Sequence, residues 1–359
     1  MKEWTNQWNP FNSAKALLHR EHFEACAKQD FLSPVTVSTD PSNRCNFNCI
    51  WCNAYEMMQK KCPDLSEDHL LRLADLYAEW GVKTTCVAGG GEPFMNPSTG
   101  KLLLRLKENG VGCAPVTNGS LITDELIEII ARTSRWVGIS MDAGTNATYM
   151  KVKGINDSKI FNRVIENIFK LTRRIKETNS ECEVGYKYLL HPFNANEIYI
   201  AAKLAKSLGV HDFQLRPVGW DNVMKTEGNI DFTSLLENIS YQIEQAMDLE
   251  DGNFHVYGIR HKFRPDFQRK VNFKKCRASP IATLTFGADG NCYLCLDMRG
   301  REDMILCSHF DILKYWNSDR HKKMLQNIDP LKCPRCTIGP YNEIVEQVFI
   351  KDRMCRDFL

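Results

Sequence analysis

Short apolar runs alternate with longer amphipathic segments between residues 35 and 218. The runs have the length and β-branched character of strands, whereas the segments between them repeat apolar residues at helical spacing. The predicted strands occupy residues 35–40, 83–89, 113–118, 136–143, 182–190 and 212–218, and the predicted helices 66–80, 98–109, 123 onward, 160–176 and 195–208. Such alternation is typical of a mostly parallel sheet. Six units joined by right-handed crossovers predict an α/β fold with a partial (β/α)6 TIM-like barrel.

Two further segments flank the predicted barrel. Since 359 residues exceed what one hydrophobic core usually supports, we expect a large domain and a smaller one. Residues 1–34 are predicted to form an N-terminal extension and residues 35–225 the barrel. Residues 226–359 comprise a linker helix at 232–248 and a smaller cysteine-rich α+β domain, because strand–helix alternation is no longer clear there.

Composition narrows the class of protein. The chain is 43% hydrophobic and 25% charged, a composition typical of globular proteins. Its formal net charge is only +2, so no strong electrostatic field favours binding to nucleic acid or to an anionic membrane. The N-terminal residues lack the basic and apolar parts of a signal peptide, and no run of about 18 apolar residues could span a membrane. We expect a cytoplasmic protein whose 15 cysteines bind metal rather than form disulfides.

Three cysteines follow the first predicted strand closely. Cys45, Cys49 and Cys52 have the spacing C-x3-C-x2-C. Structural zinc and iron–sulfur sites usually close all their coordination positions with protein ligands, so three thiolates in one loop suggest an iron cluster with one open position. A structural zinc loop with its fourth ligand elsewhere is the alternative.

This loop resembles the C-x3-C-x-aromatic-C motif of radical S-adenosylmethionine (SAM) enzymes, with Trp51 at the aromatic position. The resemblance implies a [4Fe-4S] cluster whose open iron binds the amine and carboxylate of SAM. It also implies reductive cleavage of SAM to a 5'-deoxyadenosyl radical that abstracts a hydrogen atom from a substrate. Trp51 would lie near the adenine, and an electron donor such as flavodoxin or ferredoxin would supply the electron.

A glycine-rich turn follows the second predicted strand. Gly90 and Gly91 allow close backbone approach to a ligand, and Glu92 supplies a carboxylate for an ammonium group. The run resembles the GGE motif that binds the SAM amine in the same family. A plain tight turn is the alternative.

Polar residues also lie at or near the ends of the later strands, where parallel barrels hold their chemistry. The resemblance places contacts to the SAM ribose and carboxylate at such positions, Ser140 first among them, while Asp142 could face the substrate. For each residue a solvated group or a local turn bond is an equal alternative. The full set is Asn118, Ser140, Asp142, Lys187 and Arg216.

The C-terminal region supplies four more candidate ligands. A predicted hairpin with its turn at residues 288–290 would bring Cys276 and Cys292 together, and the C-x2-C pair Cys333 and Cys336 would complete the site. The pattern is similar to the SPASM and twitch domains of radical SAM enzymes, which hold auxiliary [4Fe-4S] clusters. Asn342 and Glu346 stand where the full SPASM pattern has cysteines, which favours one auxiliary cluster. Zinc is the competing occupant.

Cys295, Cys307 and Cys355 lie outside this set of four, and two aromatic residues are candidates for the substrate site. Cys295 or Cys355 could replace a member of the auxiliary set, and one of the three, for instance Cys307, could donate a hydrogen atom to a substrate radical. Buried inert thiols are the alternative. Trp220 and Tyr257 could line the mouth of the substrate site, although core packing explains them equally well.

The substrate is predicted from weaker signals. The resemblance favours oxidation or epimerisation of a carbohydrate or other small molecule. Only 34 residues precede the first strand, too few for a separate peptide-recognition domain. A maturase of a ribosomally made peptide is the second interpretation, and a non-catalytic zinc protein is the third.

Overall fold

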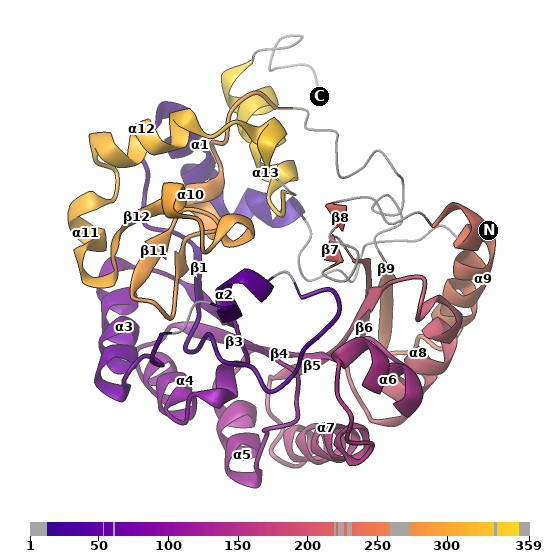
Figure 1. The fold of residues 1–359 in the computed structure, drawn as a ribbon. Helices are drawn as coiled ribbons and strands as arrows, with labels where there is room; N and C mark the ends of the chain where they lie inside the picture. Colours follow the sequence, from indigo (N-terminus) through magenta and orange to yellow (C-terminus); the bar gives the residue numbers. More distant parts are fainter. Residues whose placement is uncertain are drawn as a thin grey trace.

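The computed structural model describes residues 13–52, 54–59, 62–218, 220–221, 226–227, 232–258, 273–333 and 336–351. Its centre is a curved sheet of ten strands in the order β12-β11-β10-β1-β2-β3-β4-β5-β6-β9, with helices around the outside (Figure 1). The strands are β1 (Thr36–Thr39), β2 (Thr84–Val87), β3 (Gly112–Thr117), β4 (Trp136–Ser140), β5 (Glu183–Leu190), β6 (Asp212–Pro217), β9 (His255–Gly258), β10 (Thr285–Phe286), β11 (Asn291–Tyr293) and β12 (Ile305–Ser308). A separate antiparallel pair joins β7 (Trp220–Asp221) to β8 (Thr226–Glu227).

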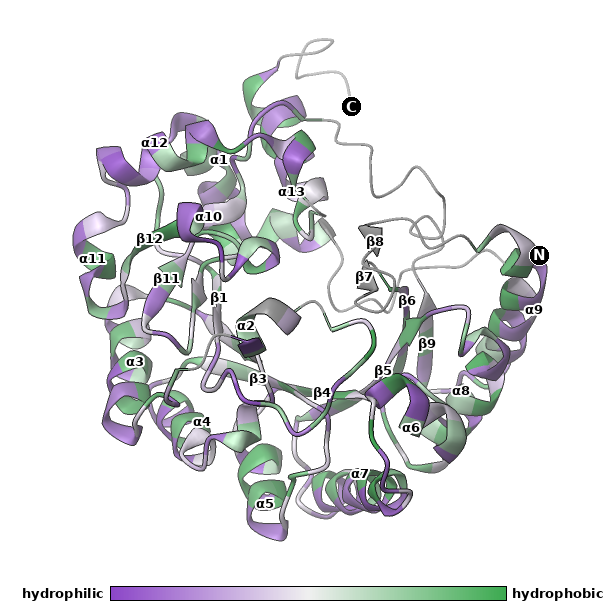
Figure 2. Ribbon diagram, in the orientation of Figure 1, coloured by the Kyte–Doolittle hydropathy of each residue, from purple (hydrophilic) through white to green (hydrophobic). Residues whose placement is uncertain are grey.

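The helices cover the outer face of the sheet, apart from the short α2, which lies inside the ring (Figure 1). They are α1 (Arg20–Lys28), α2 (Tyr55–Gln59), α3 (Glu67–Trp80), α4 (Thr99–Glu108), α5 (Asp124–Thr133), α6 (Asn146–Lys153), α7 (Lys159–Glu177), α8 (Ile198–Ser207), α9 (Leu236–Met247), α10 (Ser279–Ala282), α11 (Ile312–Tyr315), α12 (Asp319–Asn327) and α13 (Gly339–Ile344). Figure 2 shows apolar residues along the strands and mixed colouring on these helices. This distribution is that of amphipathic helices covering a buried sheet. Within the described residues, no helix is long and apolar enough to cross a membrane.

The six predicted strand–helix units are present, and neighbouring strands from β1 to β6 pair in parallel. Local signals set the ends of the helices. The Ser66 hydroxyl accepts a hydrogen bond from the His69 N–H at 3.2 Å and begins α3, which ends at Gly81 with φ +85°. Thr123 caps α5 in the same way. The predicted α/β fold with a partial TIM-like barrel is confirmed.

The region after residue 225 differs from the expected linker. Helix α9 leads into β9, which pairs in parallel with β6 and extends the barrel sheet by another strand. β9 is too short for an alternation of apolar and polar residues to be recognisable in the sequence. Its place in the sheet depends on pairing with β6. Helix α6 was also not predicted, because its eight residues show little amphipathic periodicity.

The C-terminal elements continue the same sheet at its other edge. β10 pairs in parallel with β1, and β10, β11 and β12 form an antiparallel meander. The predicted turn is present, with Gly290 at φ +83°. Helix α1 of the N-terminal segment packs against the C-terminal π-helix Val345–Ile350, and the rings of Phe23 and Tyr341 meet edge to face with centroids 5.6 Å apart.

Candidate metal centres and the inner face of the barrel

The loop between β1 and α2 holds Cys45, Cys49 and Cys52, all half-buried. Burial raises the pKa of Cys45 to about 11 and that of Cys49 to about 12, and a charge on Cys52 adds to the rise in both pKa values by repulsion. Thiols that interact in this way lie near one another, and an iron cluster binds them as thiolates. Three soft donors in one loop therefore fit a [4Fe-4S] group.

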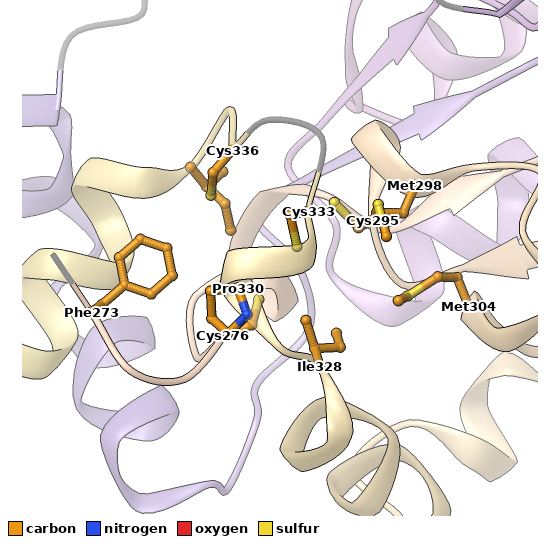
Figure 3. Close-up of a pocket in the computed structure, with 10 residues that line it drawn as sticks. Phe273, Cys276, Cys295, Met298, Met304, Ile328, Pro330, Cys333 and Cys336 are labelled. Carbon is orange, nitrogen blue, oxygen red and sulfur yellow. The ribbon is translucent and has the colours of Figure 1, made fainter. Parts of the chain in front are cut away.

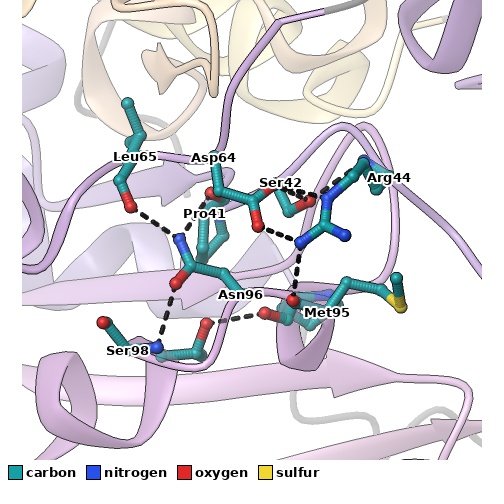
Figure 4. A network of polar contacts seen from close by, with 10 residues as sticks. Pro41, Ser42, Arg44, Asp64, Leu65, Met95, Asn96 and Ser98 are labelled. Carbon is teal, nitrogen blue, oxygen red and sulfur yellow. Dashed lines mark hydrogen bonds and ion pairs between the residues drawn. The ribbon is translucent and has the colours of Figure 1, made fainter.

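Polar contacts fix the start of this loop (Figure 4). Arg44 forms an ion pair with Asp64 and donates to the carbonyl oxygen of Met95 at 3.0 Å. The Asn96 amide donates to the carbonyl oxygens of Pro41 at 2.9 Å and Leu65 at 2.8 Å. The loop is thereby held to the segment that follows β2.

The glycine-rich turn packs directly on the cysteine loop. The Glu92 N–H donates to the carbonyl oxygen of Arg44 at 2.8 Å, and the Gly91 N–H donates to that of Ser42 at 3.1 Å. A Cβ added to Gly91 would lie 2.0 Å from the Arg44 oxygen, and one on Gly90 would lie 2.2 Å from Asn43 Oδ1. Only glycine permits this contact, so the two motifs form one structural unit.

Glu92 points into the protein. Its carboxylate accepts hydrogen bonds from Thr117 Oγ1 at 2.5 Å, the Asn118 N–H at 2.7 Å and the Phe94 N–H at 3.3 Å. Its side chain is buried, and burial raises its pKa to about 7. The carboxylate expected to receive the SAM amine is thus occupied by protein donors. Asn118 in turn donates to Asn46 of the cysteine loop at 2.8 Å.

Trp51 directly precedes the last cysteine of the loop. Trp51 is buried and stacks on His191, with ring centroids 5.2 Å apart and planes 25° apart. The Trp51 indole is therefore fixed in place by the segment after β5.

Asp142 forms a buried ion pair with Lys153 that the sequence did not reveal. Lys153 Nζ lies 2.5 Å from Asp142 Oδ2, and both side chains are almost fully buried. The other carboxylate oxygen accepts from the Leu189 N–H at 2.7 Å, and Asp142 adopts a left-handed φ of +58°. Although burial lowers the pKa of Lys153, the charges of Asp142 and the Cys49 thiolate raise it above its ordinary value.

Helix α6 connects this ion pair to the cysteine loop. The Asn48 N–H donates to the carbonyl oxygen of Lys153 and the Ile50 N–H to that of Val152, both at 3.1 Å. Lys153 therefore holds a positive charge against the thiol of Cys49 while its backbone supports the same loop. A buried lysine was not recognisable from the sequence, because its partner precedes it by eleven residues and lies after a strand.

The inner face of the sheet carries the remaining predicted polar residues. Strand register places Ser140, Lys187 and Gln214 side by side, and Arg216 lies on the same face as Gln214. Ser140, Lys187 and Arg216 are half-buried on this face. Burial and the Arg216 charge lower the pKa of Lys187 to about 8.

A second set of cysteines surrounds a small cavity in the C-terminal region (Figure 3). The cavity has a volume of about 20 Å³ and is lined by Cys276, Cys295, Cys333, Cys336, Phe273, Met298, Met304, Ile328, Pro330 and Ile338. These side chains offer sulfur and no oxygen or nitrogen ligand. The donor set fits iron–sulfur or zinc and is unsuited to hard cations such as Mg²⁺.

Cys292 lies elsewhere than the sequence predicted. It is fully buried in β11, directly opposite Cys307 of β12, and it does not line the cavity. Cys295, which the sequence left as an alternative, faces the cavity instead. Cys307 is buried at the sheet edge, with β11 and β10 between its strand and β1, so the structure does not bring it to the cysteine loop.

The two residues that replace SPASM cysteines support the segment around Cys276. Asn342 Oδ1 accepts from the N–H groups of Arg277 at 2.6 Å and Ala278 at 2.8 Å. Glu346 accepts from the Lys274 N–H at 2.7 Å. Both side chains are used as structural acceptors.

Some predictions lie outside the described residues, namely Cys355, the side chain of Trp220 and the boundary at residue 225. Among the described residues, no three histidine, cysteine or acidic side chains converge on a single metal position. The first cysteine set is therefore assigned because its members share one loop, and the second because its members line one cavity.

A family model for the radical SAM superfamily matches residues 39–205. An AdoMet-dependent heme synthase of Methanosarcina barkeri is 25% identical over 191 residues, which cover 52% of this chain and 52% of that protein. A GTP 3',8-cyclase of Staphylococcus saprophyticus is 23% identical over 276 residues, or 71% of this chain and 76% of the relative. The chain thus spans about half the length of the heme synthase.

Solved structures share the fold. SuiB of Streptococcus suis bound to S-adenosylmethionine aligns with a TM-score of 0.64 at 17% identity, over 97% of this chain and 83% of SuiB. Native anSMEcpe with bound AdoMet aligns with a TM-score of 0.58 at 15% identity, over 86% and 88% of the two chains. Both alignments extend beyond the barrel into the C-terminal region.

Proposed function

We propose that the protein is a radical SAM enzyme acting on a small molecule, since residues 39–205 match the family model for the radical SAM superfamily. Cys45, Cys49 and Cys52 would hold a [4Fe-4S] cluster. When bound, this cluster would supply the electron that cleaves SAM to a 5'-deoxyadenosyl radical. The observation that carries the proposal is the single unit formed by the cysteine loop and the glycine-rich turn.

The chain's own residues prepare this site. Lys153 places a fixed positive charge beside Cys49, which favours the thiolate that a metal requires. Asp142 orients Lys153 and is buried, so we propose a positioning role for it in place of direct contact with substrate. Glu92 ties the glycine-rich turn to Thr117 and Asn118 through its side chain, and we propose that it positions this turn beside the SAM site. Trp51 would pack near the adenine.

For the auxiliary site we propose Cys276, Cys295, Cys333 and Cys336 as ligands of one [4Fe-4S] cluster. All four line the same cavity, whereas Cys292 lies on β11 opposite Cys307 of the edge strand β12. Four protein ligands would close the site, so it would transfer electrons or shape the pocket. Zinc is the alternative occupant of this set.

The relatives support a small-molecule substrate. GTP 3',8-cyclase and an S-adenosylmethionine-dependent nucleotide dehydratase are among them. We propose hydrogen abstraction leading to oxidation or another rearrangement. Epimerisation by way of Cys307 lacks support, because that thiol is buried at the far sheet edge.

A peptide substrate is the second candidate. SuiB bound to its precursor peptide SuiA aligns with a TM-score of 0.63 at 16% identity, over 89% of this chain. Because this likeness concerns the fold alone, it supports the candidate less than the relatives support a small molecule.

Anaerobic reconstitution with iron and sulfide, followed by dithionite and SAM, tests the proposal. We expect 5'-deoxyadenosine from the native protein and none from Cys49→Ala, which removes a ligand of the SAM-binding cluster. Cys113→Ala, a buried thiol on β3 outside both cysteine sets, is the matched control and should keep the activity. Persistent 5'-deoxyadenosine formation in Cys49→Ala would contradict the proposal.

A further inference from the structure

One short segment, residues 295–300, contacts both cysteine regions of the molecule. At its start, Cys295 and Met298 line the cavity of the C-terminal cysteines (Figure 3). Asp297 accepts hydrogen bonds from the N–H of Thr337 at 2.8 Å and from its hydroxyl at 3.0 Å. These bonds fix the start of the segment to the residues that follow the C-x2-C pair.

The end of the same segment packs on helix α2, which follows the first cysteine loop. The Tyr55 N–H donates to the carbonyl oxygen of Cys52 at 3.3 Å, where this helix begins. A Cβ added to Gly300 would lie 2.3 Å from Sδ of the buried Met57. Because Gly300 also has a φ of +86°, any residue with a Cβ would be strained at this contact. The glycine therefore allows the segment to lie against the first loop.

Between these two contacts, Arg299 forms a buried ion pair with Asp40. Arg299 Nη1 lies 3.0 Å from both carboxylate oxygens, and the side chains of Arg299 and Asp40 are 12% and 0% exposed. Asp40 directly follows β1, and its carboxylate also accepts a hydrogen bond from the N–H of Gly90. The guanidinium group is thus held where β1, the glycine-rich turn and the cysteine loop meet.

The charge of Arg299 acts on the last cysteine of the loop. Arginine is always protonated in proteins, so this charge is permanent. Burial raises the pKa of Cys52, and the charges of Arg299 and Lys153 oppose this rise. The charge of Lys153 acts in the same way on Cys49. Two cations from distant parts of the chain therefore lie beside the loop, one from α6 and one from the C-terminal region.

We propose that Arg299 is a positioning residue for the SAM-binding cluster, because it holds a fixed positive charge beside the ligand Cys52 and is itself oriented by Asp40. This inference rests on the proposed function and adds an electrostatic control of the same site. A [4Fe-4S] cluster gains one negative charge on reduction, so a nearby fixed cation favours its reduced form. The C-terminal region would thereby help the first cluster to accept the electron.

Redox titration of the reconstituted protein, followed by electron paramagnetic resonance, tests the inference. The signal that SAM shifts reports the first cluster. At a fixed potential, Arg299→Met should lower the ratio of reduced to oxidised first cluster by about 10-fold, the order expected for a nearby unit charge at an effective dielectric constant of about 20. Arg299→Lys keeps the charge and should keep this ratio within about 3-fold of the native value.

Two further variants separate charge from structure. Asp40→Asn should raise the ratio, because it removes the negative partner and leaves the charge of Arg299 uncompensated. A merely structural ion pair would change the ratio in the same direction in Arg299→Met and Asp40→Asn. Arg301→Met is the matched control and should keep the native ratio. The Arg301 charge pairs with Asp303 at the exposed surface and acts on Cys333 of the other cysteine set.

The inference is overturned by a native ratio in Arg299→Met, by a 10-fold fall in Arg299→Lys, or by an unchanged or lower ratio in Asp40→Asn. Thermal unfolding checks the fold of each variant, and Asp40→Asn carries the test if Arg299→Met fails to fold. Formation of 5'-deoxyadenosine is measured on the same native preparation. The predicted ratios without SAM cleavage would overturn the proposed function and leave this inference standing, and SAM cleavage with equal ratios in all variants would do the reverse. A native protein without a SAM-sensitive signal would overturn both.

Discussion

The two cysteine regions of the molecule differ in what surrounds them. Cys45, Cys49 and Cys52 lie in one loop at the carboxyl edge of the barrel, next to the buried charge of Lys153. The cavity cysteines come from three separate segments and are enclosed by apolar and thioether side chains. In the proposed assignment, the first region would leave one position of a cluster for a polar ligand, and the second would supply a complete set of protein ligands.

This difference explains how the two regions are stabilised. The first loop depends on polar contacts with β2, β3 and α6, including the bonds of Glu92 and the ion pair of Lys153 with Asp142. The second is held by the sheet extension and by the acceptors Asn342 and Glu346. Substitutions should therefore affect one region and spare the other.

The largest effect is expected from loss of a cavity thiol. Cys295→Ala should lower the iron content of the reconstituted protein by about four atoms per chain, because it removes one ligand of the auxiliary cluster. Cys292→Ala, three residues earlier and inside the sheet, is the matched control and should keep its iron. Iron and sulfide analysis distinguishes the two, and loss of iron in Cys292→Ala alone would restore the ligand set expected from the sequence.

Local features of the molecule could be predicted from the sequence, whereas contacts between distant segments could not. The cysteine spacings and the capped helices were readable, because motifs and caps are local. Cys295 could not be preferred over Cys292 because Cys292 is buried by the pairing of β11 with β12, where it lies opposite Cys307, and the cysteine spacing does not reveal that pairing. The Lys153–Asp142 pair and the pairing of β9 with β6 depend on contacts between distant segments, which carry no local pattern.

The next effect concerns the charge beside the first loop. Lys153→Met should reduce the free energy of unfolding by about 3–5 kcal/mol, because it leaves Asp142 buried without its partner. The double change Lys153→Met, Asp142→Asn should recover part of that loss. Lys101→Met, which breaks an exposed pair with Glu67, should cost at most about 1 kcal/mol. Urea unfolding of the protein provides the comparison, and equal losses in Lys153→Met and Lys101→Met would contradict the account.

A smaller effect depends on pH. Burial raises the pKa of Glu92 to about 7 from an ordinary value of 4.5, so the folded protein favours the protonated carboxyl. The resulting stability is fully present below pH 4.5 and is lost as pH rises through 7, a change of about 3 kcal/mol. Glu92→Gln should remove this part of the pH dependence. Glu125→Gln, in the exposed first turn of α5, is the control. If the free energy of unfolding depends on pH identically in both variants, this pH dependence does not come from Glu92.

Electron paramagnetic resonance of the reduced protein, recorded with and without SAM, tests the difference between the two regions most directly. Two cluster signals are predicted, and SAM should shift only one of them, because only the three-cysteine loop leaves a position open. Cys49→Ala should retain the SAM-insensitive signal and Cys295→Ala the SAM-sensitive one. A spectrum that SAM leaves unchanged, or the same surviving signal in both variants, would contradict the account.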